Sequence, residues 1–476
     1  MPRPRLASRL HPAAAPGVAA DASLHRGAHG IRNETPPDDG RPHASEPRIV
    51  RRMAFTSAVA ARLPATRHRD FRALWGGSAC SSISLWTLLL GNAYIVYKLS
   101  DSSFWVGVST FASMSPYLLA PIGGTIADRV QRRTLVKVTR LGAFLTTSIL
   151  FTLAVTDVLT VWMVVTVALA QGIVRAVEIP SDQALLANVV PSTDLGNAVA
   201  LTSMTQHGSR AVGPLLSAPL LSTVGVSGAY ALAAVFALLS FTFVRRVRTE
   251  SRGDVVALRQ VIANLGEGLN YVRHNGPVAS VFVLVVAHCA LTMSFDAMLP
   301  GFARHELHQA STGFTIMTMG VGIGALVGTS LLAVYPGGQR GRLLLATAIA
   351  SGVSPMLMAA SRHVAVAAFS ATLMGVSQAM FMAVTAVLLQ QVIPDGIRGR
   401  VMSFYLMSAG GIMAFANLGF GTLADWTGAP ALFFLPGLSF VAIVLATSFA
   451  PHLRRLYRTG HIPGETVPAA APAGGR

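Results

Sequence analysis

The sequence predicts an all-α integral membrane protein in which twelve transmembrane helices form two related six-helix halves. Three observations support this fold class: the composition, the length of the apolar runs and an internal repeat. Of the 476 residues, 52% are hydrophobic and only 12% are charged, whereas soluble domains carry about 25% charged residues. A composition so poor in charge indicates a chain that lies mostly in lipid.

The apolar runs are long enough to cross a bilayer, which requires roughly 20 residues per helix. The first six predicted spans lie near residues 73–97, 105–127, 134–155, 160–183, 197–222 and 227–244. After a polar stretch, six more lie near residues 277–300, 311–334, 342–360, 364–391, 400–424 and 429–449. These runs give the predicted count of twelve.

The end of the fourth run resembles the end of the tenth at an offset of 203 residues. The four matching residues are Leu185, Leu186, Val189 and Pro191, which correspond to Leu388, Leu389, Val392 and Pro394. Parallel six-helix repeats are typical of transporters that bind substrate near the membrane midplane, between the two halves.

This pattern divides the chain into five segments. They are a disordered basic tail (1–65), an N-terminal six-helix half (66–244), a cytoplasmic linker (245–276), a C-terminal six-helix half (277–450) and a cytoplasmic tail (451–476). Residues 1–65 are rich in Pro, Ala, Arg, Gly and His without apolar periodicity, which is typical of disorder. Two interpretations of this tail stay open: an extension upstream of a start at Met53, or a segment that contacts anionic lipid.

The net charge of +17 does not indicate a nucleic-acid partner, because the basic residues are spread over short connections between apolar runs. The predicted inner connections carry Arg129, Arg132, Arg133, Lys137, Arg140, Arg245, Arg246, Arg248, Arg252, Arg259, Arg273, Arg340, Arg342, Arg398 and Arg400, whereas the outer ones keep Lys98, Arg304 and Arg362. Basic residues concentrate on the cytoplasmic side of membrane proteins. We therefore expect a multi-pass protein of the bacterial plasma (inner) membrane, with both termini cytoplasmic.

No motif for catalysis, metal or cofactor binding occurs in the sequence. Cys80 and Cys289 stand apart in apolar runs, and neither CxxC nor HExxH is present. There is also no GxxxxGK[ST] loop for a nucleotide. A membrane enzyme of the polyprenyl-transferase kind requires acid-rich motifs inside the membrane, but the only adjacent acids are Asp38 and Asp39 in the tail. We expect a protein that is not an enzyme, has no cofactor and draws its energy from a proton gradient.

The connection after the second run reads Gly-Gly-Thr-Ile-Ala-Asp-Arg-Val-Gln-Arg-Arg over residues 123–133. Small glycines allow close helix packing, and an acid among arginines can form ion pairs that break when two halves move. This stretch resembles the loop signature of the major facilitator superfamily, although Gln131 replaces a frequent glycine. The resemblance implies an inner gate formed by Gly124, Asp128, Arg132 and Arg133.

The fifth run contains Gly213-Pro214. A proline inside a membrane helix removes a backbone hydrogen bond and bends the helix. The pair is similar to the helix-5 signature of superfamily antiporters, with Ser217 and Ala218 in place of its usual glycines. This resemblance implies a bend at Gly213 and Pro214 and favours export.

Further motifs narrow the resemblance over residues 68–450. The segments Pro180–Leu186, Arg398–Met407 and Gly421–Gly428 are similar to the enterobactin-exporter and macrolide-efflux branch of the superfamily, the transmembrane secretion effectors. The resemblance implies a proton-coupled exporter of a small amphipathic molecule, such as a drug, antibiotic or siderophore, that acts as a monomer by alternating access. The alternative on the same fold is a nutrient importer or symporter.

Charged residues within apolar runs are the candidates for proton or substrate binding, because their burial in lipid is costly. Arg175, Glu178 and Asp182 have the spacing of one helix face. Glu178 would carry the proton with Arg175 beside it, or the two would neutralise each other structurally.

Three more charged or titratable residues lie in apolar runs. His207 and Arg210 are one turn apart in the fifth run and would face the fourth helix or a substrate anion; a purely structural role for Arg210 stays open. Asp296 in the seventh run would bind a proton or cation, or belong to an outer gate near Arg304.

Overall fold

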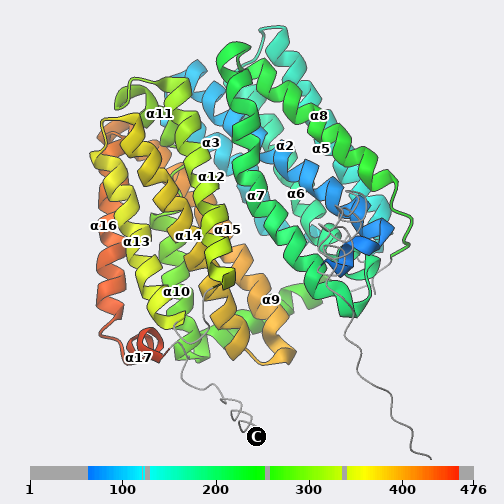
Figure 1. Ribbon diagram of the computed structural model, residues 1–476, viewed down its shortest axis with the longest axis vertical. Coiled ribbons are helices and arrows are strands. Elements are labelled where there is room, and N and C mark those ends of the chain that lie inside the picture. Colours follow the sequence, from blue (N-terminus) through cyan, green and yellow to red (C-terminus); the bar gives the residue numbers. More distant parts are fainter. Residues whose placement is uncertain (1–62, 121, 124–128, 252–257, 335–339, 460–476) are drawn as a thin grey trace, which may run out of the picture. The chain divides into compact units, whose positions relative to one another are not determined.

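A computed structural model describes residues 63–120, 122–123, 129–251, 258–334 and 340–459. Within these ranges the regular elements are all helices (Figure 1). The predicted tail lies outside them except for its last residues. These begin the short 3-10 helix η1 (Pro64–Arg67), in which Ala65 is fully buried. The described helical structure thus includes two residues before the predicted boundary at residue 66.

Helical segments occupy the twelve predicted ranges. The N-terminal half contains α2 (Arg69–Ser100), α3 (Ser103–Met114), η2 (Ser115–Leu119), α5 (Arg132–Val155), α6 (Val161–Val189), α7 (Ser192–Thr223) and α8 (Val226–Arg245). The remainder contains α9 (Leu258–His274), α10 (Gly276–Leu291), α11 (Leu299–His305), α12 (Ala310–Val334), α13 (Arg340–Ala360), α14 (Val364–Val392), α15 (Asp395–Thr427), α16 (Ala429–Thr447) and α17 (Pro451–Thr459).

Nine of the described helices are long and apolar enough to cross a membrane, or ten if the bent pair α9–α10 counts as one span. Among those below this limit, α3 has only 12 residues. The described helices thus confirm an all-helical membrane architecture, while the count of twelve spans stays a prediction.

Each half has its own helix packing, and two helix pairs make the most extensive contacts between the halves. In the N-terminal half α2 and α5 both pack against α8, and in the C-terminal half α12 packs against α14 and α13 against α16. Between the halves, α3 lies along α15 and α7 along α12 (Figure 1). We call the end where α2 finishes and α3 begins the distal end, and the end where α2 begins the proximal end.

Glycines set the closeness of these two contacts. A Cβ added at Gly107 of α3 would lie 2.9 Å from the backbone oxygen of Asn417, and one at Gly322 of α12 would lie 2.5 Å from the Cα of Ala211. Neither position can hold a side chain without separating the backbones.

The seventh predicted span is not one helix. Helix α10 ends at Leu291 and helical structure resumes only at Leu299. Side chains from neighbouring helices satisfy the backbone groups that the break frees: Nε2 of Gln378 donates to the Thr292 oxygen at 2.8 Å, and Oδ1 of Asn417 accepts from the Ala297 nitrogen at 3.3 Å. The apolar run predicted a continuous helix because it contains no sign of these distant partners.

Helix α7 continues through Pro214 and Pro219. Gly213 lies against α2, where an added Cβ would come within 2.8 Å of the Trp86 Cβ. The predicted glycine therefore serves close packing of α7 on α2, and the bend at Pro214 stays a prediction.

Candidate functional site

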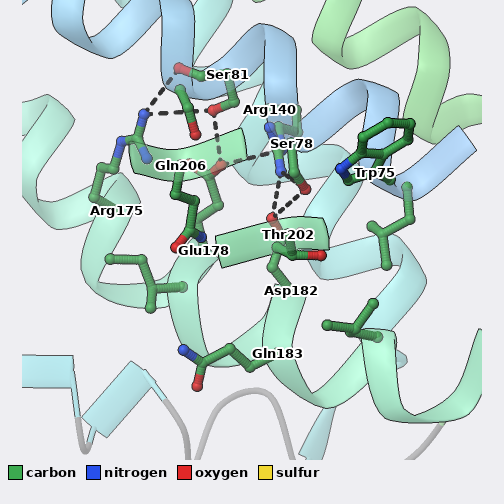
Figure 2. A pocket seen from close by; sticks show the side chains of 14 residues that line it. Trp75, Ser78, Ser81, Arg140, Arg175, Glu178, Asp182, Gln183, Thr202 and Gln206 are labelled. Atoms are coloured by element: carbon green, nitrogen blue, oxygen red, sulfur yellow. Dashed lines mark hydrogen bonds and ion pairs between the residues drawn. The ribbon is translucent and has the colours of Figure 1, made fainter. Parts of the chain in front are cut away.

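Two carboxylates share one guanidinium inside the N-terminal half (Figure 2). Nε of Arg140 lies 3.0 Å from Oε1 of Glu178, and Nη2 of Arg140 forms an ion pair with Oδ2 of Asp182. The side chains of Arg140 and Glu178 are only 1% and 3% exposed, while that of Asp182 is 20% exposed. The arginine comes from α5 and both acids come from α6.

The prediction that Arg140 belongs to an inner loop is wrong. Helix α5 begins at Arg132, so Arg140 lies about two turns inside it. Its Nη1 donates to the Gly77 oxygen at 2.9 Å and to Oγ of Ser240 at 2.7 Å. The signal that could have identified it is its place within the predicted span 134–155, where an arginine needs a partner.

Arg175 reaches Glu178 only through a serine of α2. Its Nη2 donates to the backbone oxygen of Ser81 at 3.1 Å, and Oγ of Ser81 donates to Oε1 of Glu178 at 3.0 Å. The predicted direct pairing of Arg175 with Glu178 is therefore replaced by pairing with Arg140. As predicted, Arg175, Glu178 and Asp182 share one face of their helix and meet at one place (Figure 2).

Each acid keeps a buried oxygen without a hydrogen-bond partner among the described residues: Oε2 of Glu178 and Oδ1 of Asp182. Oδ2 of Asp182 also accepts from Oγ of Ser78 at 3.1 Å. A buried acceptor without a partner is costly, and either a proton or a water molecule would relieve it.

A small cavity of about 50 Å³ adjoins the cluster. Besides the charged residues, Trp75, Gln183, Thr202 and Gln206 line it (Figure 2). A polar space of this size holds a few water molecules. A water molecule in this cavity would lie beside Asp182, which lines it.

A second pair of charged residues, Arg210 and Asp296, lies where the halves meet. The guanidinium carbon of Arg210 is 4.9 Å from the centre of the Trp86 ring, in cation–π geometry. Asp296 lies in the break between α10 and α11 and lines a cavity of about 40 Å³ with Trp86, Met114 and Phe314. Arg210 interacts electrostatically with Asp296 but forms no ion pair within 4.0 Å. Arg210 thus contacts α2, while its predicted role toward the fourth helix or a substrate anion stays a prediction; the side chain of His207 lies outside the described structure.

Comparison with known proteins decides the family. The sequence profile described as transmembrane secretion effector matches residues 60–469. The chain belongs to the transmembrane secretion effector family. Macrolide efflux protein A of Streptococcus pyogenes is 24% identical over 399 residues, which cover 81% of this chain and 97% of the relative. The staphyloferrin A transporter of Staphylococcus aureus is 22% identical over 375 residues, which cover 76% and 92%.

Solved structures share the fold of this secretion effector at low identity. A POT family transporter in complex with 5-aminolevulinic acid has a TM-score of 0.66 at 12% identity, covering 81% of this chain and 97% of that one. A peptide transporter POT gives 0.66 at 13% identity, covering 82% and 96%. The family and these folds confirm the resemblance to the major facilitator superfamily: the chain is a membrane transporter of small molecules and not an enzyme.

Two predicted inner-gate residues of the secretion effector, Gly124 and Asp128, lie outside the described residues. Of the other two, Arg132 begins α5 and its backbone nitrogen donates to the Ser251 oxygen at 2.9 Å, while Arg133 is half-buried beside it. The gate itself therefore stays a prediction.

Arg304, which the outer-gate alternative placed near Asp296, forms its ion pair with another residue. Nη1 of Arg304 lies 2.8 Å from Oδ1 of Asp101, at the distal end, so its ion-pair partner belongs to the other half. Asp296 remains a candidate for proton or cation binding, but the ion-pair partner of Arg304 is Asp101.

Proposed function

We propose that this protein exports a small amphipathic molecule in exchange for protons, by alternating access of its two halves. Membership of the transmembrane secretion effector family supports export, as do the relatives whose names describe macrolide efflux and transport of staphyloferrin A. The halves 66–244 and 277–450 would rock about the midplane. The protein would work as a monomer in the bacterial inner membrane, with both termini cytoplasmic and without a cofactor or nucleic-acid partner.

The observation that carries proton coupling is the pair of buried acids on one guanidinium. Arg140 is the one cation in direct contact with two carboxylates among the described residues. The second nearby cation, Arg175, is linked to Glu178 by hydrogen bonds through Ser81. A proton on either acid changes the balance of the cluster by a full charge in a low-dielectric interior, where such changes are large.

Asp182 is the member of the pair that exchanges the proton with water, because it is more exposed than Glu178 and lines the cavity. Glu178 stays with Arg140 and keeps α5 and α6 together. Release of the proton from Asp182 restores its ion pair with Arg140 and draws α6 toward α5, which links the proton to helix position.

The test is proton flux in inside-out vesicles with an acidified interior. Addition of a transported compound should collapse the pH gradient in the wild type, and this response should be lost in Asp182→Asn and Glu178→Gln. The matched control is Asp157→Asn, because Asp157 is an exposed acid in a turn with φ 57°, which asparagine also adopts.

Substrate exchange without any gradient separates loss of coupling from loss of folding. Both variants should still exchange labelled substrate across the membrane, since the substrate pathway is intact. If a protein with both Asp182→Asn and Glu178→Gln keeps full proton-driven transport, the coupling role of this pair is wrong. If neither the variants nor the wild type move any compound, the proposed export function is wrong.

A further inference from the structure

At the distal end, one carboxylate of the C-terminal half caps a helix of the N-terminal half. Oδ1 of Asp425, near the end of α15, accepts from the backbone nitrogen of Ser103 at 2.7 Å, and Oδ2 accepts from that of Phe104 at 3.2 Å. Oγ of Ser102 donates to the same carboxylate. Three donors at the start of α3 thus converge on a residue more than 320 positions later in the chain.

The Asp425 carboxylate provides hydrogen-bond acceptors for the first backbone N–H groups of α3. The first N–H groups of a helix have no partner within the helix, and their dipoles favour a negative charge. Ser102 is the N-cap residue, but its side chain accepts no capping hydrogen bond. The cap comes from the opposite half instead, so it exists only while the halves are together at this end.

Close backbone packing places the carboxylate. Gly421 lies one turn before Asp425, and a Cβ there would be 2.6 Å from the Ser103 backbone oxygen. Gly107, one turn into α3, packs equally closely on the Asn417 backbone. The glycines bring α3 and α15 together, and Asp425 then reaches the free N–H groups.

Two further contacts between the halves surround this cap. Arg304 pairs with Asp101 at 2.8 Å, and Nε2 of His305 lies 2.9 Å from the Tyr97 hydroxyl. Arg304 and Asp101 are 46% and 58% exposed, and such exposed pairs contribute little. Asp425 differs because its charge meets backbone donors of fixed position.

We propose that Asp425 is a distal latch: its carboxylate holds the start of α3 against α15, and its release opens the substrate pathway to the distal side. The proposal rests on alternating access, but not on proton coupling or on the direction of transport. The distribution of arginines in the sequence assigns this side to the outside of the cell.

Labelling of a cysteine behind the latch measures this opening. Thr110 is buried and lines the cavity that contains Asp296, so Thr110→Cys reports access from either end. The background is Cys80→Ala with Cys289→Ala, because these are the two cysteines of the chain. A membrane-impermeant maleimide is added to right-side-out or inside-out vesicles, without substrate and without a gradient.

Loss of the latch should raise the labelling rate from the outside about two- to fivefold, the ratio expected for a charge at a helix N-terminus. This is the result for Asp425→Asn and Asp425→Ala, with no rise from the inside. Asp425→Glu, which keeps the carboxylate, should stay near the wild type, and Asp157→Asn should not differ from it.

An unchanged outside rate in both Asp425→Asn and Asp425→Ala overturns the latch. Equal increases from both sides also overturn it, because they indicate general loosening. Since labelling needs no transport, a protein that exports nothing can still show the latch, and failure of the latch leaves the proposed export function untouched. If Asp425→Asn or Asp425→Ala folds poorly, the labelling rates of the remaining neutral variant and of Asp425→Glu are compared instead.

Discussion

Nε of Arg140 lies 3.0 Å from Oε1 of Glu178, and both side chains are almost completely buried. The pair joins α5 to α6, two helices that are neighbours in sequence but connected only through a distal turn. Ser81 of α2 donates to the same carboxylate oxygen. The Glu178 carboxylate therefore joins three helices of the N-terminal half.

Replacement of Arg140 by methionine should destabilise the protein strongly, because it leaves two buried carboxylates without their cation. Loss of one partner from a buried ion pair costs about 3–5 kcal/mol. Thermal unfolding in detergent measures the effect. The combination Arg140→Met with Glu178→Gln and Asp182→Asn should recover much of the loss, and a triple variant no more stable than Arg140→Met contradicts the pairing.

Gly213→Ala should separate α7 from α2, since the added Cβ would lie 2.8 Å from the Trp86 Cβ. Overpacking of this kind costs about 1–3 kcal/mol. Gly196→Ala on the same helix is the matched control, because a Cβ there meets nothing within 4 Å and alanine favours the helix. Equal melting temperatures for the two variants would show that the α2–α7 contact is looser than described.

Asn417→Leu and Gln378→Met should each destabilise the break between α10 and α11. Each removes the partner of a buried backbone group, at a cost of about 1–3 kcal/mol. Gln391→Met is the control, because Gln391 is exposed on the same helix as Gln378. Hydrogen exchange over residues 292–298 should become faster in the first two variants and stay unchanged in the third.

Asp296→Asn should lower the transport rate with little effect on stability, because no described residue forms an ion pair with Asp296 that the substitution would break. Loss of one hydrogen bond from the charged carboxylate to a substrate corresponds to about 1.5–3 kcal/mol, or on the order of ten- to hundredfold in rate. Transport and thermal unfolding are measured on the same preparation. A variant that unfolds as easily as Arg140→Met but transports normally assigns Asp296 a structural role.

The sequence predicted three members of the charged cluster but not the arginine that joins the two acids. Arg175, Glu178 and Asp182 are three, four and seven positions apart within one apolar run, so their common face followed from helix geometry. The identity of their cation did not follow from helix geometry, because Arg140 comes from another helix. Its position near a basic connection led to its assignment to an inner loop.

Asp425 was missed although the sequence contains a signal for it. Residues 124–128 read Gly-Thr-Ile-Ala-Asp and residues 421–425 read Gly-Thr-Leu-Ala-Asp. The first segment resembles the family's loop signature, and the second repeats it at the end of α15. The repeat alone could not reveal its partner, because a carboxylate that caps a distant helix leaves no mark in the sequence of that helix.

By itself the sequence determined the membrane environment, the helical class, the two related halves and the family, since these follow from apolar length, charge distribution and local motifs. Tertiary structure decided which buried charges meet and where an apolar run breaks. The physical reason is the distance along the chain over which each interaction acts. Helix formation and membrane insertion depend on residues close in sequence. The contacts of Arg140 with Glu178, of Asn417 with the broken segment and of Asp425 with the start of α3 depend on how separate helices pack.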